Sequence, residues 1–396
     1  MPDQFLHGVE VVQIDDGLRP IQTVKSSIIG FVGTAPDADA ADFPLNAPVL
    51  VTGPRMASAL GALGTLRAAY LAAYAQGVAE IVVVRVEHGA DAAATRANVI
   101  GDETLYAGVY AFLASGSLNG QVPRILAAPG FTSGDPADGV NPVVSALLSV
   151  ASRLRAVVIK DGPNMTEAAA IVDAALYGSD RLYIVDPAVR VFDQTTATSL
   201  TRPASAFVAG LLSKRDRERG FWWSPSNQEV RGITGVSRPV GFQMSEPATE
   251  ANRLNEAKVA TIIRQNGFRL WGNRSTATDP IWAFLSVRRT ADMIYESIEA
   301  AHLWAMDRPF SAQLLLDIRD SVQAYLDTLI TRGAILGGRV WLDPELNTEA
   351  TLKQGKLFLD FDIEPPAPLE RLTFRAHRNG VYYEELVATV ITAQGV

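Results

Sequence analysis

The sequence has no cysteine, and its charge balance is acidic. Among its 396 residues, 43 Asp and Glu outnumber 35 Lys and Arg, which gives a formal net charge of −8. The missing cysteines exclude disulfides and thiolate metal sites and fit folding in a reducing compartment. Nucleic-acid binding without sequence preference needs clustered Lys and Arg, and the chain has no basic stripe. We therefore predict no direct nucleic-acid partner.

Motifs of catalysis and of nucleotide binding are missing as well. The chain contains no G-x-G-x-x-G, G-x-x-x-x-G-K-[ST], H-E-x-x-H or G-x-S-x-G. None of the histidines has a second ligand at metal-binding spacing, since they are scattered over positions His7, His88, His302 and His377. We therefore predict no enzymatic activity, no cofactor and no metal site.

Long apolar runs that could span a membrane are also missing. The N-terminus lacks the charged and apolar regions of a secretion signal. Residues 56–79 carry only one charge, Arg67, but they are mostly Ala and Gly, and a mid-span Arg costs about 2.5–3.5 kcal/mol on insertion scales. We expect a buried helix followed by a strand here, and no direct membrane insertion.

The chain does have the pattern of an α/β domain over residues 21–248. Its length and its 48% hydrophobic content suffice for a sizeable core and for roughly two to three domains. Apolar runs rich in β-branched residues alternate with helical patterns, which predicts a mostly parallel sheet covered on both faces. The expected strands are 27–33, 80–86, 124–128, 156–159 and 181–185, and the expected helices are 65–76, 140–154 and 166–177.

Two aspartates, Asp161 and Asp186, follow expected strands directly, where α/β folds often bind ligands. In an enzyme they would act as an acid and a base. Asp, Asn, Gly and Pro also form turns and helix caps at such positions, and we favour this structural role.

Residues 249–366 predict a second, α+β domain. One helix is expected over 290–305 and a second from Ser311, as N-cap, to Gly333, as C-cap. The second helix has an apolar seam at spacings of three and four, and its opposite, charged face is either solvated or binds a partner. Strands are expected at 338–343 and 356–362. The seam consists of Leu315, Ile318, Val322, Tyr325 and Leu329.

The sequence predicts extended arms at the two termini, over residues 1–20 and 367–396. Each contains a β-prone segment, at 8–14 and at 385–391, and the run Pro365-Pro366-Ala367-Pro368 stiffens the C-terminal connection. A strand on a spacer can pair with its own sheet or with that of a neighbour.

The segment 265–274 is rich in aromatic residues and punctuated by glycine. Gly267 and Gly272 permit tight turns, and Trp271 supplies large apolar area. We expect Trp271 to be packed and Arg269 or Arg274 to form an ion pair nearby, so that the segment holds the junction of the two domains.

Together with other motifs, this segment carries a resemblance that covers essentially the whole chain. In their order and spacing, the motifs resemble the contractile tail sheath proteins of myophages, and most closely the short sheaths of R-type pyocins. They are Phe43-Pro44-Leu45-Asn46, Pro48-Val49-Leu50, Phe221-Trp222-Trp223-Ser224-Pro225-Ser226-Asn227, Gly232-Ile233-Thr234-Gly235, Gly267-Phe268-Arg269-Leu270-Trp271-Gly272-Asn273-Arg274, Trp304-Ala305-Met306-Asp307 and Gln354-Gly355-Lys356.

The resemblance implies a subtilisin-like but non-catalytic central domain. It also implies a six-start helical sleeve of identical subunits around an inner tail tube, which contracts without nucleotide hydrolysis. The helix 311–332 would face the tube, with Arg319 and Arg332 as candidate contacts. The arms would donate strands to adjacent subunits through Val9, Val11 and Ile14 at one end and Leu386, Val387 and Val390 at the other.

The partners implied by this resemblance are other copies of the chain, the inner tube protein, and baseplate and tail terminator proteins. The chain would be made in the bacterial host cytoplasm and would end in a virion tail or in a headless tailocin. Two alternatives remain open from the residues alone, namely an α/β enzyme with an unrecognised site and a homo-oligomeric binding module that does not contract.

Overall fold

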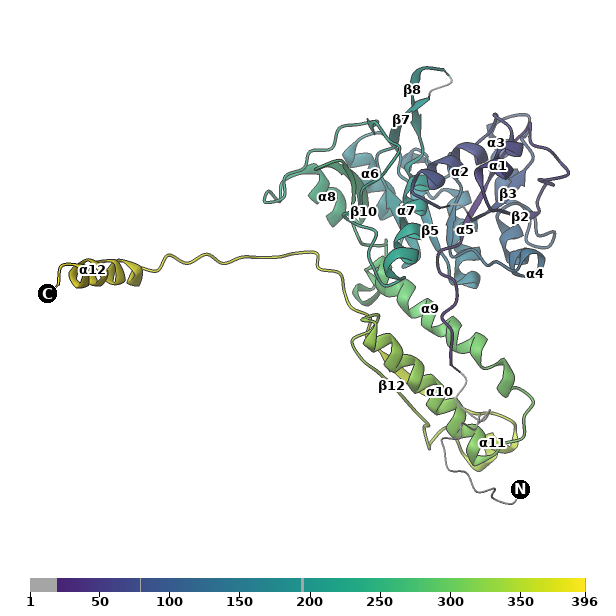
Figure 1. Ribbon diagram of the computed structural model, residues 1–396. Coiled ribbons are helices and arrows are strands. Elements are labelled where there is room, and N and C mark those ends of the chain that lie inside the picture. The colour runs from purple at the N-terminus through teal and green to yellow at the C-terminus, as the bar shows by residue number, and fades with distance from the viewer. Residues whose placement is uncertain (1–19, 79, 194–195, 396) are drawn as a thin grey trace, which may run out of the picture.

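The computed structural model describes residues 20–78, 80–193 and 196–395. A broad α/β domain stands on a narrower domain built around two long helices, and the C-terminal segment extends far from both (Figure 1).

The α/β domain is organised by one eight-stranded sheet with the order β11-β10-β6-β5-β4-β1-β3-β2. The six central strands are parallel, and one antiparallel strand closes each edge. The predicted mostly parallel sheet is therefore confirmed. The strands are β1 (Ile29–Thr34), β2 (Pro48–Val51), β3 (Ile81–Val86), β4 (Ile125–Ala127), β5 (Val157–Asp161), β6 (Leu182–Val185), β10 (Val259–Arg264) and β11 (Phe268–Trp271).

Helices cover both faces of this sheet because successive side chains of its buried strands point to opposite sides. In β3, Ile81 and Val83 pack under α2 (Leu66–Ala75) and α7 (Ala204–Arg219), whereas Val82 and Val84 pack under the opposite layer. That second layer contains α3 (Ala92–Ile100), α5 (Pro142–Leu154) and α6 (Glu167–Ala175). Smaller helices are α1 (Pro54–Ala57), α4 (Ser115–Asn119) and α8 (Glu250–Glu256).

The α/β domain extends beyond the predicted boundary at residue 248. Strand β10 pairs in parallel with β6, and β11 pairs with β10, so the chain stays in the large sheet up to Trp271. Five of the six β10 residues are buried, which is typical of an interior strand of a parallel sheet. We therefore end the α/β domain after residue 271, and the prediction that 249–271 opens the second domain is wrong.

A three-stranded sheet projects from this domain. Strand β7 (Val189–Asp193) pairs with β8 (Thr198–Arg202) on one side and with the short β9 (Gly235–Val236) on the other. The β7–β8 hairpin forms the upper tip of the molecule in Figure 1.

The second domain packs α9 (Leu285–Ala301) and α10 (Ala312–Thr331) against a hairpin of β12 (Gly338–Trp341) and β13 (Asp360–Ile363), with α11 (Glu349–Lys353) between the two strands. Helix α10 starts as predicted, because the Ser311 hydroxyl accepts a hydrogen bond from the Leu314 amide at 3.1 Å. It ends at Gly333, whose φ of 73° allows the Ala334 amide to bond to the Leu329 carbonyl.

The apolar seam of α10 is displaced slightly from the prediction. Val322, Tyr325 and Leu329 are buried as expected, but Leu315 is only partly buried and Leu326 lies in the core. Residues spaced three and four apart define a broad stripe, and tertiary contacts select its centre.

The C-terminal segment differs from the prediction of a strand. Residues 381–393 form helix α12 (Val381–Ala393), which includes the whole segment expected to be extended. A strand must pair with a neighbouring edge, whereas a helix satisfies its own backbone groups, and this segment lies beside no sheet of its own chain (Figure 1).

The N-terminal candidates Val9, Val11 and Ile14 lie outside the described residues. Among the helices of the described ranges, none is both long and apolar enough to cross a membrane.

Candidate functional site: domain junction and assembly arms

The two aspartates at the strand ends are held in internal hydrogen bonds. Asp161 accepts from the backbone amide and the hydroxyl of Ser205, at 2.8 and 2.6 Å, in the first turn of α7. Asp186 accepts from the Asn164 amide at 2.8 Å and pairs with Arg238 at 2.5 Å. Burial raises the pKa of the Asp161 carboxyl, against the hydrogen bonds from Ser205. Both carboxylates therefore act as turn and cap residues. Within the described residues, no His, Asp and Glu cluster has the arrangement of a metal site.

The two domains are joined by ion pairs along α9. Three arginines that precede neighbouring strands of the large sheet reach down to acidic residues of this helix. Arg181 forms two hydrogen bonds to Asp292, at 2.5 and 2.9 Å. The remaining pairs are Arg124 with Glu296 and Arg155 with Glu299. We call these three pairs the junction clamp.

Most of the junction clamp is removed from solvent. The Asp292 side chain is fully buried, and those of Arg124 and Arg181 are 6% and 12% exposed. Burial raises the pKa of Glu296 despite the attraction of Arg124. On the same helix, Arg289 forms a second buried pair with Asp216 of α7. A buried pair that loses one partner leaves an uncompensated charge, so the clamp resists separation of the domains.

The junction clamp was not predicted from the sequence, although the positions of its arginines before strands pointed to it. Arg124 and Arg181 each stand directly before a strand, and Arg155 stands two residues before one. Because the amino ends of parallel strands meet at one edge of a sheet, such arginines form a row that an acidic helix can neutralise.

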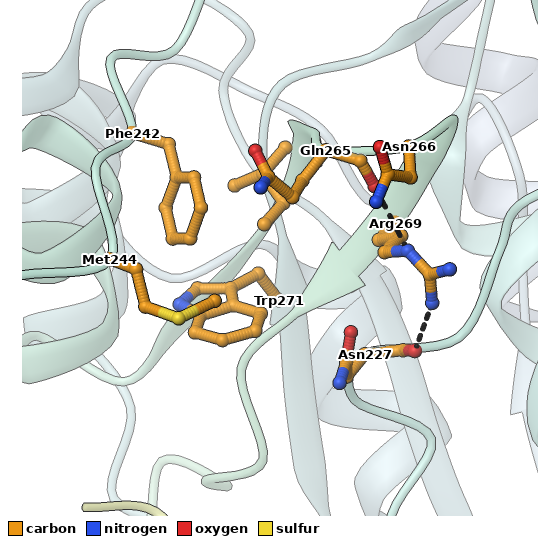
Figure 2. A pocket seen from close by; sticks show the side chains of 8 residues that line it. Asn227, Phe242, Met244, Gln265, Asn266, Arg269 and Trp271 are labelled. Carbon is orange, nitrogen blue, oxygen red and sulfur yellow. Dashed lines mark hydrogen bonds between the residues drawn. The ribbon is translucent and has the colours of Figure 1, made fainter.

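The aromatic segment lies at the edge of the large sheet rather than between the domains. Trp271 is half-buried and packs edge-to-face on Phe242, with ring centroids 5.1 Å apart. Arg269 donates to the carbonyl oxygens of Gln265 and Asn227, at 3.0 and 2.9 Å (Figure 2). These side chains surround an open pocket of about 280 Å³, which Met244 also lines.

Arg274 holds the start of the C-terminal arm. Its guanidinium forms two hydrogen bonds to Glu370, at 2.8 and 2.6 Å, and lies over the Phe284 ring. Glu370 is part of the chain between β13 and α12. The pair thus fixes the point at which the arm leaves the body of the protein.

The two arginines predicted to contact a tube already have partners in their own chain. Arg319 pairs with Asp320, and Arg332 lies 5.3 Å from the centre of the Trp222 ring. Thirteen positions separate them, which at about 100° per residue places them about 140° apart around the axis of α10. They therefore start from different sides of the helix.

The β12–β13 hairpin has room for further strands. Within the described residues it is a two-stranded sheet, and neither outer edge pairs with another strand. Its inner face packs on the core of the second domain through Val340 and Phe361. At the outer edge of β12, the Gln323 side chain accepts from the Val340 amide at 3.0 Å and donates to the Gly338 carbonyl at 3.3 Å. The edge available to a further strand is therefore that of β13, and free strand edges bind further strands readily.

Both arms leave from the second domain. Before entering β1, the N-terminal segment runs along this domain, where Val24 donates to the Ser297 hydroxyl at 3.1 Å and Ile21 packs on the core. At the other end every described residue from 369 to 395 is exposed, including the apolar side chains Leu372, Phe374 and Leu386. Such an extended apolar segment is unusual for a monomer and typical of an assembling subunit.

These features define a class of protein, namely a structural subunit in which two clamped domains carry long arms. The sequence comparisons agree with this class. The family model of the phage tail sheath protein central domain matches residues 98–276, and that of the phage tail sheath C-terminal domain matches residues 277–378. The chain belongs to the phage tail sheath protein family.

Relatives cover nearly the whole length of the chain. A putative prophage major tail sheath protein of Pseudomonas aeruginosa (strain UCBPP-PA14) is 39% identical over 97% of this chain and 99% of its own. The tail sheath protein of Escherichia phage P2 is also 39% identical, over 98% of both chains. The predicted resemblance is therefore confirmed.

Solved structures share the fold. The helical sheath of the anti-feeding prophage in its contracted state has a TM-score of 0.70 at 19% identity, covering 95% of this chain and all of that chain. The contracted sheath complex of an extracellular contractile injection system, PVC, has a TM-score of 0.69 at 16% identity, covering 96% of this chain and all of that one.

Proposed function

We propose that this chain assembles as a six-start helical sleeve around an inner tail tube, and that the sleeve contracts to drive the tube through a target cell envelope. The observation that carries the proposal is the combination of exposed apolar arms with a hairpin whose β13 edge pairs with no other strand among the described residues. Arms and edges of identical chains are complementary, and a heterologous contact that does not close generates a helix.

The C-terminal arm is long enough to reach another subunit. The connection from Glu370, where the arm leaves the body of the protein, to Asn379 is extended in Figure 1 and spans about 30 Å at about 3.3 Å per residue. A strand supplied from this distance would add to a free edge of the β12–β13 hairpin through main-chain hydrogen bonds. Leu386, Val387 and Val390 remain our candidates for this contact, together with Val9, Val11 and Ile14 of the N-terminal arm.

Contraction needs flexible connections between rigid units. In this proposal the junction clamp keeps each subunit rigid, while the arms preserve the connectivity as the subunits re-dock. The free energy would come from contacts that are more favourable in the contracted lattice, summed over many copies, so that no nucleotide hydrolysis and no enzymatic step are required.

The inner tube protein is the second proposed partner, with α10 as the facing helix. Because Arg319 and Arg332 start from different sides of this helix, we propose that only one of them contacts the tube. Baseplate and tail terminator proteins would bind the two ends of the sleeve. The subunit would be made in the host cytoplasm and would end in a virion tail, or in a headless tailocin that works by the same mechanism.

Removal of each arm tests the proposal. Chains lacking residues 1–16 or 380–396 should stay folded, as measured by thermal melting, but should form no long sheaths in negative-stain electron microscopy. The full-length chain should form hollow tubes under the same conditions. Normal contractile sheaths from either truncated chain would refute strand exchange between subunits.

A further inference from the structure

The C-terminal helix has a composition that opposes its own conformation. Of the 13 residues of α12, six are β-branched and two are tyrosine, and such residues favour strands over helices. Thr389 and Thr392 each donate their hydroxyl to the carbonyl oxygen four residues earlier, a contact that slightly destabilises helices. Its N-cap residue is Gly380, which has no side chain, and the Asn379 side chain accepts from the first amide of the helix, that of Val381, at 3.1 Å.

No tertiary packing compensates for this composition. Every residue of α12 is exposed, and its apolar side chains lie on all sides, with Tyr382, Leu386 and Val390 between 49% and 66% exposed. Isolated helices shorter than about 12–15 residues are marginal in water even with Ala-rich sequences. The helical and extended forms of this segment are therefore close in free energy, and a small contribution selects one of them.

A strand edge would supply that contribution. In the free subunit α12 lies beside no sheet, and only the helix satisfies its backbone groups without a partner. At an open edge of the β12–β13 hairpin of a second copy, the same backbone groups would pair across the strands, and Leu386, Val387 and Val390 would be covered.

We propose that the C-terminal arm is a helix-to-strand switch, helical in the free subunit and extended once docked on a second copy. This inference rests on the proposed function, and it adds a mechanism that controls when subunits assemble. The helical form hides the hydrogen-bonding groups of the arm, so that free subunits do not pair prematurely, and docking releases them only at a growing end.

The absence of cysteine makes the switch directly measurable in the full chain. Spin labels at Val381→Cys and Thr392→Cys are separated by eleven residues, which corresponds to about 16 Å in a helix and about 36 Å in a strand. Labelled chains would be diluted into unlabelled chains, so that labels on different chains lie far apart. Double electron–electron resonance then reports the distance between the two labels of one arm. We expect the short distance in free subunits and the long one in sheaths assembled on the tube protein.

Two sets of substitutions test whether this equilibrium controls assembly. Val387→Leu, Thr389→Ala and Val390→Leu together keep the segment apolar and favour the helix about tenfold. Glu385→Thr with Ala388→Val favours the strand. The first variant should lengthen the lag before assembly several-fold, and the second should shorten it. Generic damage to the arm would slow both variants, and that result would contradict the switch.

The outcomes separate the switch from the function on which it rests. The same distance in free and assembled chains, whether about 16 or about 36 Å, would overturn the switch even where deletion of residues 380–396 abolishes assembly. Normal sheaths from that deletion would overturn the strand exchange of the proposed function and the switch with it.

Discussion

The guanidinium of Arg181 and the carboxylate of Asp292 meet across the domain junction, with N–O distances of 2.5 and 2.9 Å. Arg181 stands just before strand β6 of the large sheet, and Asp292 lies fully buried on α9. Arg288 bonds to the same carboxylate from one turn earlier on the helix. Asp292 of the second domain thus neutralises the charge of Arg181, which stands at the amino end of a strand of the first domain.

Replacement of this arginine should be costly. Arg181→Ala leaves the Asp292 carboxylate with Arg288 as its remaining partner in a buried site, which should lower the free energy of unfolding by up to about 3–5 kcal/mol. Urea denaturation followed by tryptophan fluorescence measures the loss. The matched control is Arg153→Ala, whose pair with Glu103 is similarly short, 2.6 Å, but roughly half exposed on both sides. The control should cost about 1 kcal/mol or less, and equal losses would show that burial does not strengthen the clamp.

The clamp should also respond to pH in two opposite ways. The hydrogen bond from Arg155 lowers the pKa of Glu299 below its ordinary value of 4.5, so its stabilising contribution is present above that pH and is lost as the pH falls through the folded-state pKa. Burial raises the pKa of Glu296, so its contribution is largest at low pH and decreases as the pH rises through its folded-state pKa.

Glu299→Gln and Glu296→Gln separate the two effects. The stability difference between the native chain and Glu299→Gln should shrink on acidification from pH 6 to below 4, and the difference for Glu296→Gln should change in the opposite direction. Denaturation curves at each pH provide the test, and parallel pH profiles for the two variants would contradict the assignment of the shifts.

The Trp271–Phe242 contact should stabilise the edge of the sheet. Because Trp271 is half-buried, Trp271→Ala should cost about 1–3 kcal/mol, less than the 3–5 kcal/mol typical of a fully buried ring. A double-mutant cycle with Phe242→Ala should give a coupling of about 0.5–1.5 kcal/mol. If Trp271→Ala melts like the native chain and fails only in assembly, the residue belongs to an interface between subunits.

The Arg274–Glu370 pair should matter for assembly more than for folding. Both side chains are more than a third exposed, so Glu370→Ala should change the free energy of unfolding by about 1 kcal/mol or less. It should nevertheless reduce sheath yield, because the arm loses its fixed point of departure. The exchanged pair Arg274→Glu with Glu370→Arg should restore the yield, and a failure of this rescue would mean that Arg274 acts through its contact with Phe284.

The regular parts of the fold were open to prediction from local patterns. Alternating apolar runs and helical periods gave the parallel sheet, and Ser311 with Gly333 marked the two ends of α10. Both ends depend on hydrogen bonds between residues close in sequence, so the signal is local. The family resemblance was equally accessible, since it rests on the order of short motifs such as 267–274.

Other features depended on contacts that no local pattern contains. Strand β10 belongs to the large sheet because it pairs with β6, about 75 residues earlier in the chain, and this pairing moved the domain boundary. Trp271 packs on Phe242, which comes from a loop about 30 residues earlier in the chain. The three pairs of the junction clamp likewise join residues more than 100 positions apart.

By itself, the sequence determined the family and the types of the main elements within the two domains, because helix periods, caps and buried strand runs are set by neighbouring residues. Only the tertiary structure decided where the first domain ends, which acidic residues receive its arginines, and that the C-terminal arm of a free chain is a helix. The physical reason is that strand pairing and charge burial depend on what lies nearby in space. The β-prone arm lies beside no strand edge of its own chain, so its backbone bonds within itself.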